Sequence, residues 1–373
     1  PAWTNLKGAP MTHARQPRTR RTTLALAALL AVGGAPLPAA HAAACTFNPA
    51  SGNWNVAANW SCALVPSGPA ADSASIGAGK TVTVNDPRSI FIFNNAGALN
   101  LDASTFSLQG GGNTTNSGTL NVGGTSTAAL QMLHAVANSG GVINIANGSV
   151  LNQFAGALSG GTVNIASGGT YGQQGGALNG ATINGTGSGV LAVNGSAGNV
   201  LTGVTLGARM DMALTANSRQ RVTGGLALNG ASIDLNNNGI LSFEGTQALT
   251  GSGTIVLGST GGGNRIDLDG NGTTTFGAGV VVRGHSGSIG QEINFGGTQT
   301  LLNLGTISAD VAGGTITLLQ SDVSNQGTLS ALNGGTLVLA SNVTGSGSGQ
   351  IVAGAGSRVI QNGVTLAGQI NTS

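Results

Sequence analysis

The chain has 373 residues, of which 66 are glycine, 6% are charged and 3% are aromatic. Ordinary domains carry about 25% charged residues and about 7% glycine, and disordered chains combine low hydrophobicity with high net charge. This chain is 40% hydrophobic with a formal charge of +2, so its composition excludes the disordered class. Residues 43–373 hold 8 basic and 11 acidic residues, a net charge of −3. That acidic balance argues against a nucleic-acid partner, because phosphate binding requires clustered Lys and Arg.

Residues 11–42 have the pattern of a secretory signal peptide. Met11 opens a basic stretch, an apolar segment follows, and Ala40-His41-Ala42 matches the small-x-small cleavage pattern. A membrane-spanning helix is the alternative, but glycines and prolines at positions 33 to 38 interrupt the run before the ~20 residues that a span requires. We therefore expect an exported protein. Residues 1–10 precede this start and are expected not to belong to the native chain, and no later segment is long and apolar enough to span a membrane.

The chain has two cysteines, Cys45 and Cys62. Export places them in an oxidising compartment, where we expect them to form a disulfide. Closing a loop of this length would stabilise the fold by about 3 kcal/mol on the chain-entropy model. The alternative is a lipoprotein in which residues 42–45, Ala-Ala-Ala-Cys, form a degenerate lipid-attachment site. That alternative lacks the usual leucine and leaves Cys62 without a partner.

Residues 43–94 are expected to form a small amino-terminal cap. Two of the three tryptophans, Trp54 and Trp60, lie in this segment close to the cysteines. The first coil of a stacked β protein has an unpaired edge that must be covered. Two large aromatic side chains, held by the Cys45–Cys62 bridge, would supply that cover.

The segment GNWNVAANWSCALVPSGPAADSASI, residues 52–76, resembles the opening of many exported bacterial β-helix proteins. These include autotransporter passenger domains and related adhesin-like surface proteins. The resemblance implies a surface location, associated with the bacterial outer membrane, and an adhesive role. Autotransporters also have a carboxy-terminal membrane barrel with aromatic girdles, a pattern not found in the last hundred residues. We therefore expect a barrel or another anchor beyond residue 373, and a repeat region that is incomplete at its carboxy end.

From residue 95 onward an apolar–polar–apolar triplet recurs between Gly, Asn and Ser residues. Short alternating segments of this kind predict strands, and a period of about 20 residues predicts a solenoid. We expect residues 95–373 to form an all-β, right-handed parallel β-helix with coils of about 20 residues and about 13 turns. The triplets, the fifth a half copy, begin at Leu99, Leu120, Ile143, Val163, Ile183, Val204, Ile233, Ile255, Ile266, Ile293, Ile316, Leu337 and Val364.

Stacking explains why charge is scarce. Equivalent positions in neighbouring coils lie about 4.8 Å apart. Like charges repeated at such a position would repel each other, which costs roughly 1 kcal/mol per pair in water. Asn, Thr and Ser stack without this cost. The central asparagines of five triplets either form a hydrogen-bonded ladder or face solvent without mutual contact, and both interpretations are open here: Asn100, Asn121, Asn144, Asn164 and Asn184. The segment 127–138, TAALQMLHAVAN, departs from the strand pattern and has a short helix as its alternative.

Two segments resemble the first half of a calcium-binding loop. Asp267, Asp269 and Asn271 place oxygen ligands at alternate positions before a glycine, as Ca²⁺ loops do, and residues 234–239 repeat the pattern. Neither segment has the bidentate glutamate at the twelfth position, where Ala278 stands in the first. Weak calcium binding at Asp267, Asp269 and Asn271 is one hypothesis. A turn that links two strands is the other, and no other cofactor is expected.

An enzyme is the alternative function, because some β-helices cleave polysaccharides. Residues 284–290, GHSGSIG, faintly resemble a stretch of pectin-hydrolysing β-helix enzymes. Hydrolysis by that class requires carboxylates placed as acid and base. The acids nearby are Asp267, Asp269 and Glu292, without an Asp-Asp pair. We therefore expect no catalytic residues and no enzymatic activity.

The sequence thus predicts an exported structural or adhesive protein of the bacterial surface or extracellular space. Its expected partners are a host cell, a neighbouring cell or a polysaccharide, and nucleic acid is not expected. A β-helix enzyme that acts on polysaccharide remains the alternative.

Overall fold

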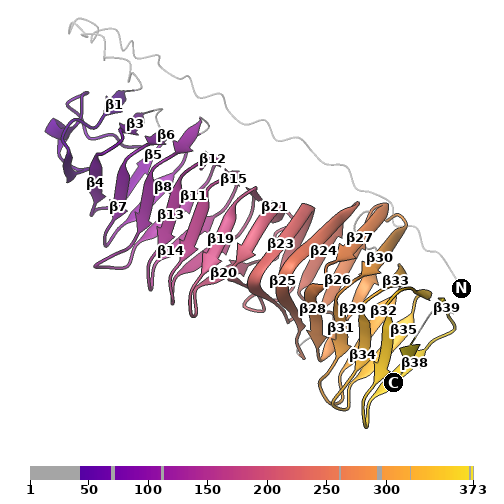
Figure 1. Cartoon of the computed structure of the whole chain (residues 1–373). Coiled ribbons are helices and arrows are strands. Elements are labelled where there is room, and N and C mark those ends of the chain that lie inside the picture. The colour runs from indigo at the N-terminus through magenta and orange to yellow at the C-terminus, as the bar shows by residue number, and fades with distance from the viewer. Residues whose placement is uncertain are drawn as a thin grey trace, which may run out of the picture. The chain divides into compact units, whose positions relative to one another are not determined.

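A computed structural model describes residues 43–68, 72–110, 113–259, 262–291, 296–319, 321–368 and 371–372. The expected signal peptide and the residues before it lie outside these ranges. The described residues form a parallel β-solenoid of about 13 turns, with one short 3-10 helix, Ala57–Asn59. Most coils supply three strands, and each strand pairs with its counterparts in the neighbouring coils, which gives three faces, A, B and C (Figure 1).

Face A carries the ladder asparagines that the sequence singled out. Its strands pair in parallel from one coil to the next. They are β2 (Ser51–Asn53), β4 (Thr81–Val84), β7 (Ala98–Leu101), β10 (Thr119–Val122), β13 (Val142–Ile145), β16 (Thr162–Ile165), β19 (Thr182–Gly185), β27 (Gly272–Phe276), β30 (Gln299–Asn303), β33 (Asp322–Asn325), β36 (Val343–Gly345) and β39 (Leu366–Gly368).

Face B follows face A in the chain direction within a coil. Its strands are β5 (Arg88–Ile90), β8 (Thr105–Leu108), β11 (Ala129–Met132), β14 (Val150–Gln153), β17 (Thr170–Gln173), β20 (Val190–Val193), β22 (Arg209–Met212), β28 (Gly279–Gly284), β31 (Thr306–Ala309), β34 (Thr328–Ala331), β37 (Gln350–Ala353) and β40 (Asn371–Thr372). The helix considered as an alternative for residues 127–138 is not formed, because β11 and the face C strand Val136–Ala137 occupy that segment.

Face C closes each coil. Its strands are β1 (Ala44–Thr46), β3 (Ser73–Ile76), β6 (Ile92–Asn95), β9 (Thr114–Asn116), β12 (Val136–Ala137), β15 (Ala157–Ser159), β18 (Ala177–Asn179), β24 (Ile240–Glu244), β26 (Arg265–Asp269), β29 (Ser286–Gln291), β32 (Thr315–Leu319), β35 (Thr336–Ala340) and β38 (Arg358–Gln361). Three longer strands bend around corners and serve more than one face: β21 (Val200–Gly207), β23 (Arg219–Leu235) and β25 (Gln247–Leu257).

The core is a stack of aliphatic side chains. Alternate residues of each strand point inward, as period-two patterning predicts, so that Ile143 pairs with Val163 and Ile145 with Ile165 in the next coil. All four side chains are at most 1% exposed. The predicted stacking of these triplets is therefore confirmed.

The coil of residues 160–179 has three strands, one on each face. The face B strand of this coil, β17, contains its aromatic residue. Its Tyr171 is fully buried and donates a hydrogen bond to Gln153 Oε1 at 2.9 Å. Burial raises the pKa of this phenol, so Tyr171 is a neutral core residue with one satisfied polar atom.

The corners between faces C and A require close backbone approach. A second row of hydrogen-bonded asparagines, distinct from the ladder on face A, lies at the corners of successive coils. Asn95 Nδ2 donates to Asn116 Oδ1 at 2.8 Å, and Asn116 Nδ2 donates to Asn138 Oδ1 at 2.6 Å. Gly161 follows at the next corner with a φ of +68°, and a Cβ there would lie 2.1 Å from the carbonyl oxygen of Asn138. Glycine is thus required at that position by both conformation and space.

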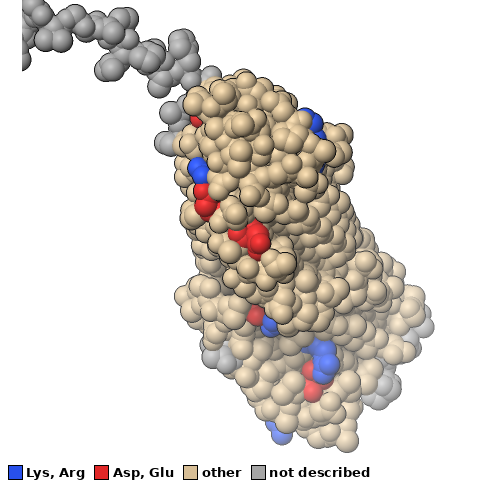
Figure 2. Space-filling view, turned by 90° about the vertical axis from the view of Figure 1, so that its left-hand side faces the viewer, with Lys and Arg blue, Asp and Glu red and all other residues tan. Residues whose placement is uncertain are grey.

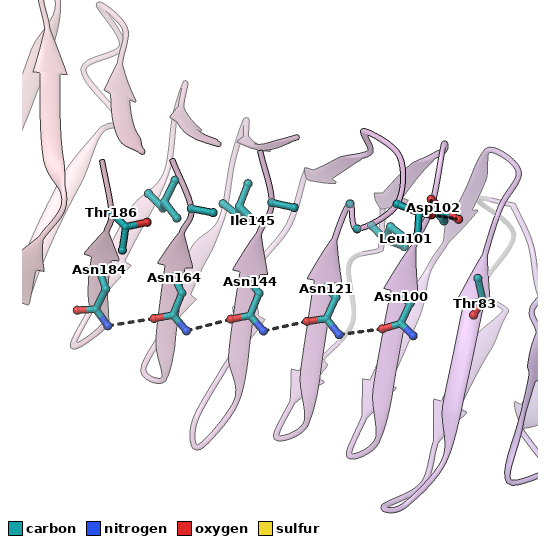
Figure 3. A pocket seen from close by; sticks show the side chains of 16 residues that line it. Thr83, Asn100, Leu101, Asp102, Asn121, Asn144, Ile145, Asn164, Asn184 and Thr186 are labelled. Atoms are coloured by element: carbon teal, nitrogen blue, oxygen red, sulfur yellow. Dashed lines mark hydrogen bonds between the residues drawn. The ribbon is translucent and has the colours of Figure 1, made fainter. Parts of the chain in front are cut away.

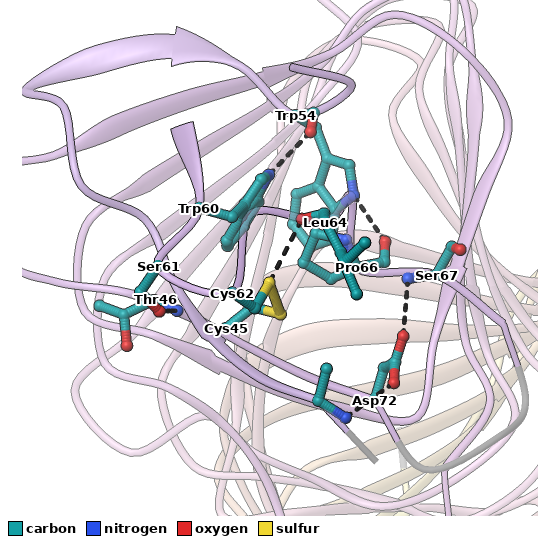
Figure 4. Close-up of a disulfide and its surroundings, with 11 residues drawn as sticks. Cys45, Thr46, Trp54, Trp60, Ser61, Cys62, Leu64, Pro66, Ser67 and Asp72 are labelled. Atoms are coloured by element: carbon teal, nitrogen blue, oxygen red, sulfur yellow. Dashed lines mark hydrogen bonds between the residues drawn. A yellow bond between two sulfur atoms is a disulfide. The ribbon is translucent and has the colours of Figure 1, made fainter. Parts of the chain in front are cut away.

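The expected disulfide is present between Cys45 and Cys62, with a Cα–Cα distance of 5.1 Å (Figure 4). Beside it, Trp54 and Trp60 are buried with ring centroids 4.7 Å apart. Trp54 Nε1 donates to the carbonyl of Pro66 at 2.9 Å, and Trp60 Nε1 donates to the carbonyl of Trp54 at 2.8 Å. Both indole N–H groups of this aromatic pair at the amino end of the stack therefore have a hydrogen-bond acceptor.

Parallel pairing begins earlier than residue 95. Strand β1 pairs with β3, β3 with β6, β4 with β7 and β5 with β8, so residues 43–94 already contribute coil strands to all three faces. The tryptophans pack onto these coils, since Trp54 also contacts the rings of Phe93 and Phe106. The expected cap and the first coils are one continuous packing unit.

Removal of the disulfide should destabilise this end. The double change Cys45→Ala and Cys62→Ala is expected to lower the free energy of unfolding of the amino-terminal coils by about 3 kcal/mol, because the unfolded chain gains freedom. Amide hydrogen exchange read by mass spectrometry measures this. Peptides from β30 to β36 serve as the internal control, and equal protection of β1 to β4 with and without the disulfide would contradict the prediction.

Candidate functional site

The asparagine ladder predicted as one of two alternatives is present on face A. Asn121 Nδ2 donates to Asn100 Oδ1, and Asn144 Nδ2 donates to Asn121 Oδ1, both at 2.8 Å. The row continues with Asn164 to Asn144 at 2.9 Å and Asn184 to Asn164 at 3.0 Å (Figure 3). Every amide points the same way along the stack. The ladder arises because the five asparagines are in register on outward positions of consecutive strands.

The ladder ends on each side where the equivalent position in the next coil is not an asparagine. Thr83 lies in register with Asn100 at one end, and Gly207 lies in register with Asn184 at the other. Neither residue carries an amide that would continue the row. The ladder therefore covers five consecutive face A strands, from β7 to β19.

A groove of about 760 Å³ follows the ladder. The asparagines form one side, and residues of the turns that lead from face A to face B form the other, among them Gly123, Gly124, Thr125 and Thr186. Asp102 is the charged residue among the described residues that line the groove. Both of its oxygens lie 3.0 Å from the Thr125 hydroxyl, which donates to this carboxylate.

The ladder leaves hydrogen-bonding capacity toward the groove. A side-chain amide has two N–H donors and a carbonyl with two lone pairs. Each internal asparagine uses one donor and one lone pair within the ladder. All five residues are half-buried and line the groove, and each internal asparagine keeps one donor and one lone pair that the ladder does not use.

The residues of the calcium hypothesis lie elsewhere, on face C. Asp267 and Asp269 are on the same side of strand β26, and both are 0% exposed. Asp267 forms an ion pair with Arg265 at 3.1 Å, and the Ser242 hydroxyl donates to Asp269. Asn271 lies in the following turn and accepts a hydrogen bond from the backbone N–H of Thr298 at 2.9 Å. The structure thus brings the two aspartates together and gives Asn271 a different partner.

These carboxylates belong to a charged cluster that spans β23, β24 and β26. Arg221 forms an ion pair with Glu244 in the next coil, and its guanidinium also interacts with Asp269. In the part of the chain that the structure describes, no group of three or more His, Cys, Asp or Glu residues could hold a metal. Calcium binding at Asp267, Asp269 and Asn271 stays a prediction.

The second calcium-like segment, residues 234–239, covers the last two residues of β23 and the turn to β24. Asn237 and Asn238 have φ angles of 53° and 66°, a left-handed conformation that asparagine tolerates in turns. Asn237 Nδ2 donates to the carbonyl of Ala213 at 2.8 Å, and Asp234 forms an ion pair with Arg209 at 2.5 Å. Its asparagines therefore hold the turn against the preceding coil.

Burial raises the pKa of Asp267 to about 6, although the Arg265 guanidinium opposes the rise and the Asp269 carboxylate adds to it. The ordinary value is 3.8, so between about pH 4 and pH 6 the folded chain holds a proton that the unfolded chain has released. The contribution of Asp267 to stability should therefore fall, by on the order of 3 kcal/mol, as the pH rises through that window.

Asp267→Asn should remove this fall from the pH profile of the melting temperature, measured by circular dichroism between about pH 4 and pH 7. Asp322→Asn, which changes an exposed carboxylate, is the matched control and should keep the wild-type profile. If Asp267→Asn and the wild-type chain show the same profile, the buried carboxylate does not titrate as stated.

The residues of the enzyme alternative are only partly brought together. Asp267 and Asp269 are two residues apart on one strand, about 7 Å along the backbone, but neither is exposed to a substrate. His285 Nδ1 lies 2.6 Å from the Ser286 hydroxyl, and Glu292 lies outside the described residues.

Within the described ranges, the structure contains no helix with the length and hydrophobicity needed to cross a bilayer.

No protein-family model matches the chain, and the comparison with curated proteins found no match. Among solved structures, the chain is similar to the TibA55-350 fragment, described as hyper-glycosylated by TibC catalysis. The identity is 20% and the TM-score is 0.27, with 79% of this chain and 95% of the fragment covered. A likeness at this level assigns no function to the chain.

Proposed function

We propose that this protein is an exported, non-enzymatic rod that makes adhesive contacts at the bacterial cell surface or in the extracellular space. The observation that carries the proposal is the parallel pairing that connects β1 to β40 on three faces around one buried aliphatic core. Such a stack has many equivalent side-chain rows on its surface, which suits repeated contacts along a partner.

The state of the carboxylates supports a structural and adhesive role. Each Asp and Glu among the described residues either forms an ion pair or accepts a hydrogen bond from the protein. Figure 2 shows a largely uncharged face with a few small clusters of basic and acidic atoms. Acid and base catalysis requires carboxylates that meet the substrate, whereas here they contact groups of their own strand or turn, or of a neighbouring coil.

Adhesion assays with beads coated with the full chain test the proposal. The beads should attach to cell monolayers or to polysaccharide-coated surfaces more strongly than beads coated with heat-denatured chain. The same preparation should release no reducing sugar from a panel of polysaccharides. Attachment no greater than that of the denatured control would overturn the adhesive role, and release of reducing sugar would favour the enzyme alternative.

A further inference from the structure

We propose that the groove along the face A ladder is a binding site for an extended, uncharged glycan chain. This assignment rests on the proposed adhesive function and names its partner. It concerns the groove beside Asn100, Asn121, Asn144, Asn164 and Asn184.

The first argument is hydrogen-bond complementarity. Each internal rung keeps one amide donor and one acceptor that the ladder does not use, and the rungs repeat at the interstrand spacing of about 4.8 Å. A sugar hydroxyl both donates and accepts, and a glycan that lies along the stack presents its hydroxyls at regular intervals. An acyl chain in the same groove would bury the amides without partners, which is unfavourable.

The second argument is charge. The described residues that line the groove include no Lys or Arg, and Asp102 lies near its Asn100 end. Nucleic acids and acidic polysaccharides require basic side chains to offset their repulsion. A peptide strand would need a free backbone edge, but β10, β13 and β16 each pair with a strand on both sides. These two facts favour a neutral polymer that is recognised through side chains.

The third argument is rigidity. Four ladder hydrogen bonds fix the orientation of the amides before any ligand binds. Preorganised groups lose little conformational entropy on binding, and aligned hydrogen bonds polarise one another. Because every amide points in the same direction (Figure 3), the two ends of the groove differ, and the glycan should bind in one orientation. Four interstrand steps give a contact length of about 19 Å.

Affinity electrophoresis of the full chain tests the site. The neutral probes are hydroxyethylcellulose, mannan and dextran, and the acidic probes are polygalacturonate and hyaluronate. At least one neutral probe should retard the chain, and the acidic probes should not. Asn144→Ala with Asn164→Ala should weaken binding by about tenfold, because two of the rungs lose their amides.

The control is Asn152→Ala with Asn179→Ala, the same change at one face B position and one face C position, and it should bind as the wild type does. Gly124→Ile is designed to narrow the groove, because Gly124 lines it, and it should leave the ladder unaltered, because a Cβ at Gly124 would meet no atom within 4 Å. This variant should also bind about tenfold less tightly, and it keeps the test valid if the ladder variant unfolds.

The groove assignment is overturned if no neutral probe retards the chain, if acidic probes retard it more, or if the ladder and control variants bind equally. Bead attachment that persists in any of these cases would leave the adhesive role standing with its contact on another face. If beads coated with the folded wild-type chain do not attach, both proposals are overturned.

Discussion

Replacement of Ile145 by aspartate is expected to lower the free energy of opening of the surrounding coils by more than about 4 kcal/mol. Ile145 is 1% exposed and lies in register between Val122 and Ile165. A carboxylate at this position would have apolar side chains on both sides along the stack. It would either lose its hydration or take up a proton, and both outcomes cost stability. Hydrogen exchange of peptides from β10, β13 and β16 measures the effect.

The neighbouring change, Asn144→Asp, is the matched control. Asn144 points outward from the same strand, is half-buried and donates to Asn121. Aspartate keeps an acceptor for Asn164 and loses that donor, so the expected cost is about 1 kcal/mol. If the two aspartates destabilise these coils equally, the inward and outward assignment of β13 is wrong.

Replacement of Trp54 by alanine is expected to cost about 3–5 kcal/mol at the amino end of the stack. The side chain is 0% exposed and contacts Trp60, Phe93 and Phe106 with ring centroids 4.7, 6.1 and 5.2 Å away. Its removal would leave a large cavity and would also remove the hydrogen bond to the carbonyl of Pro66. Exchange should accelerate in β3, β4 and β6.

Val56→Ala is the control for this change, because Val56 is 43% exposed in the same segment. It should leave exchange in β3, β4 and β6 unchanged. Coils from β30 onward should be unaffected by both variants, since each coil of a solenoid contacts only its neighbours. Protection of β3 that survives Trp54→Ala would show that the aromatic pair does not hold the first coils.

The sequence predicted the solenoid because its early triplets share one face. Leu99, Leu120, Ile143, Val163 and Ile183 are in register on face A. The later triplets were treated as copies of the same unit, but several of them are on other faces. Ile233 pairs with Ile255 on face B, and Ile266 pairs with Leu241 on face C. A single alternating pattern cannot distinguish three faces that all bury alternate residues, which explains the looser spacing.

The amino end was predictable in its components and less so in its arrangement. Cys45, Cys62, Trp54 and Trp60 stand out in a chain with few such residues, and both the disulfide and the aromatic packing are present. The start of parallel pairing at β1 was missed. Strands of three or four residues separated by a long loop have little periodicity to reveal them.

The groove and the charged cluster illustrate what sequence cannot show. The ladder asparagines recur visibly, but its ends depend on register with Thr83 and Gly207. The turn residues of the opposite wall have no shared pattern that would have marked them. Likewise, Asp269 meets Ser242 and Arg221 through strands more than twenty residues earlier. A calcium-like spacing is a local signal, and the partners of these carboxylates are not local.

The register of face A underlies the core, the ladder and the groove, and one crosslinking measurement tests it directly. Thr162 and Thr182 are outward partners on β16 and β19. In-register residues on adjacent strands have Cα atoms close enough for a disulfide to form between cysteines at those positions. Thr162→Cys with Thr182→Cys should therefore crosslink on mild oxidation, as peptide mapping by mass spectrometry would show. Thr162→Cys with Thr170→Cys, which places the second cysteine on face B, should stay reduced. Crosslinking of the second pair and not of the first would contradict the stacking and the glycan site built on it.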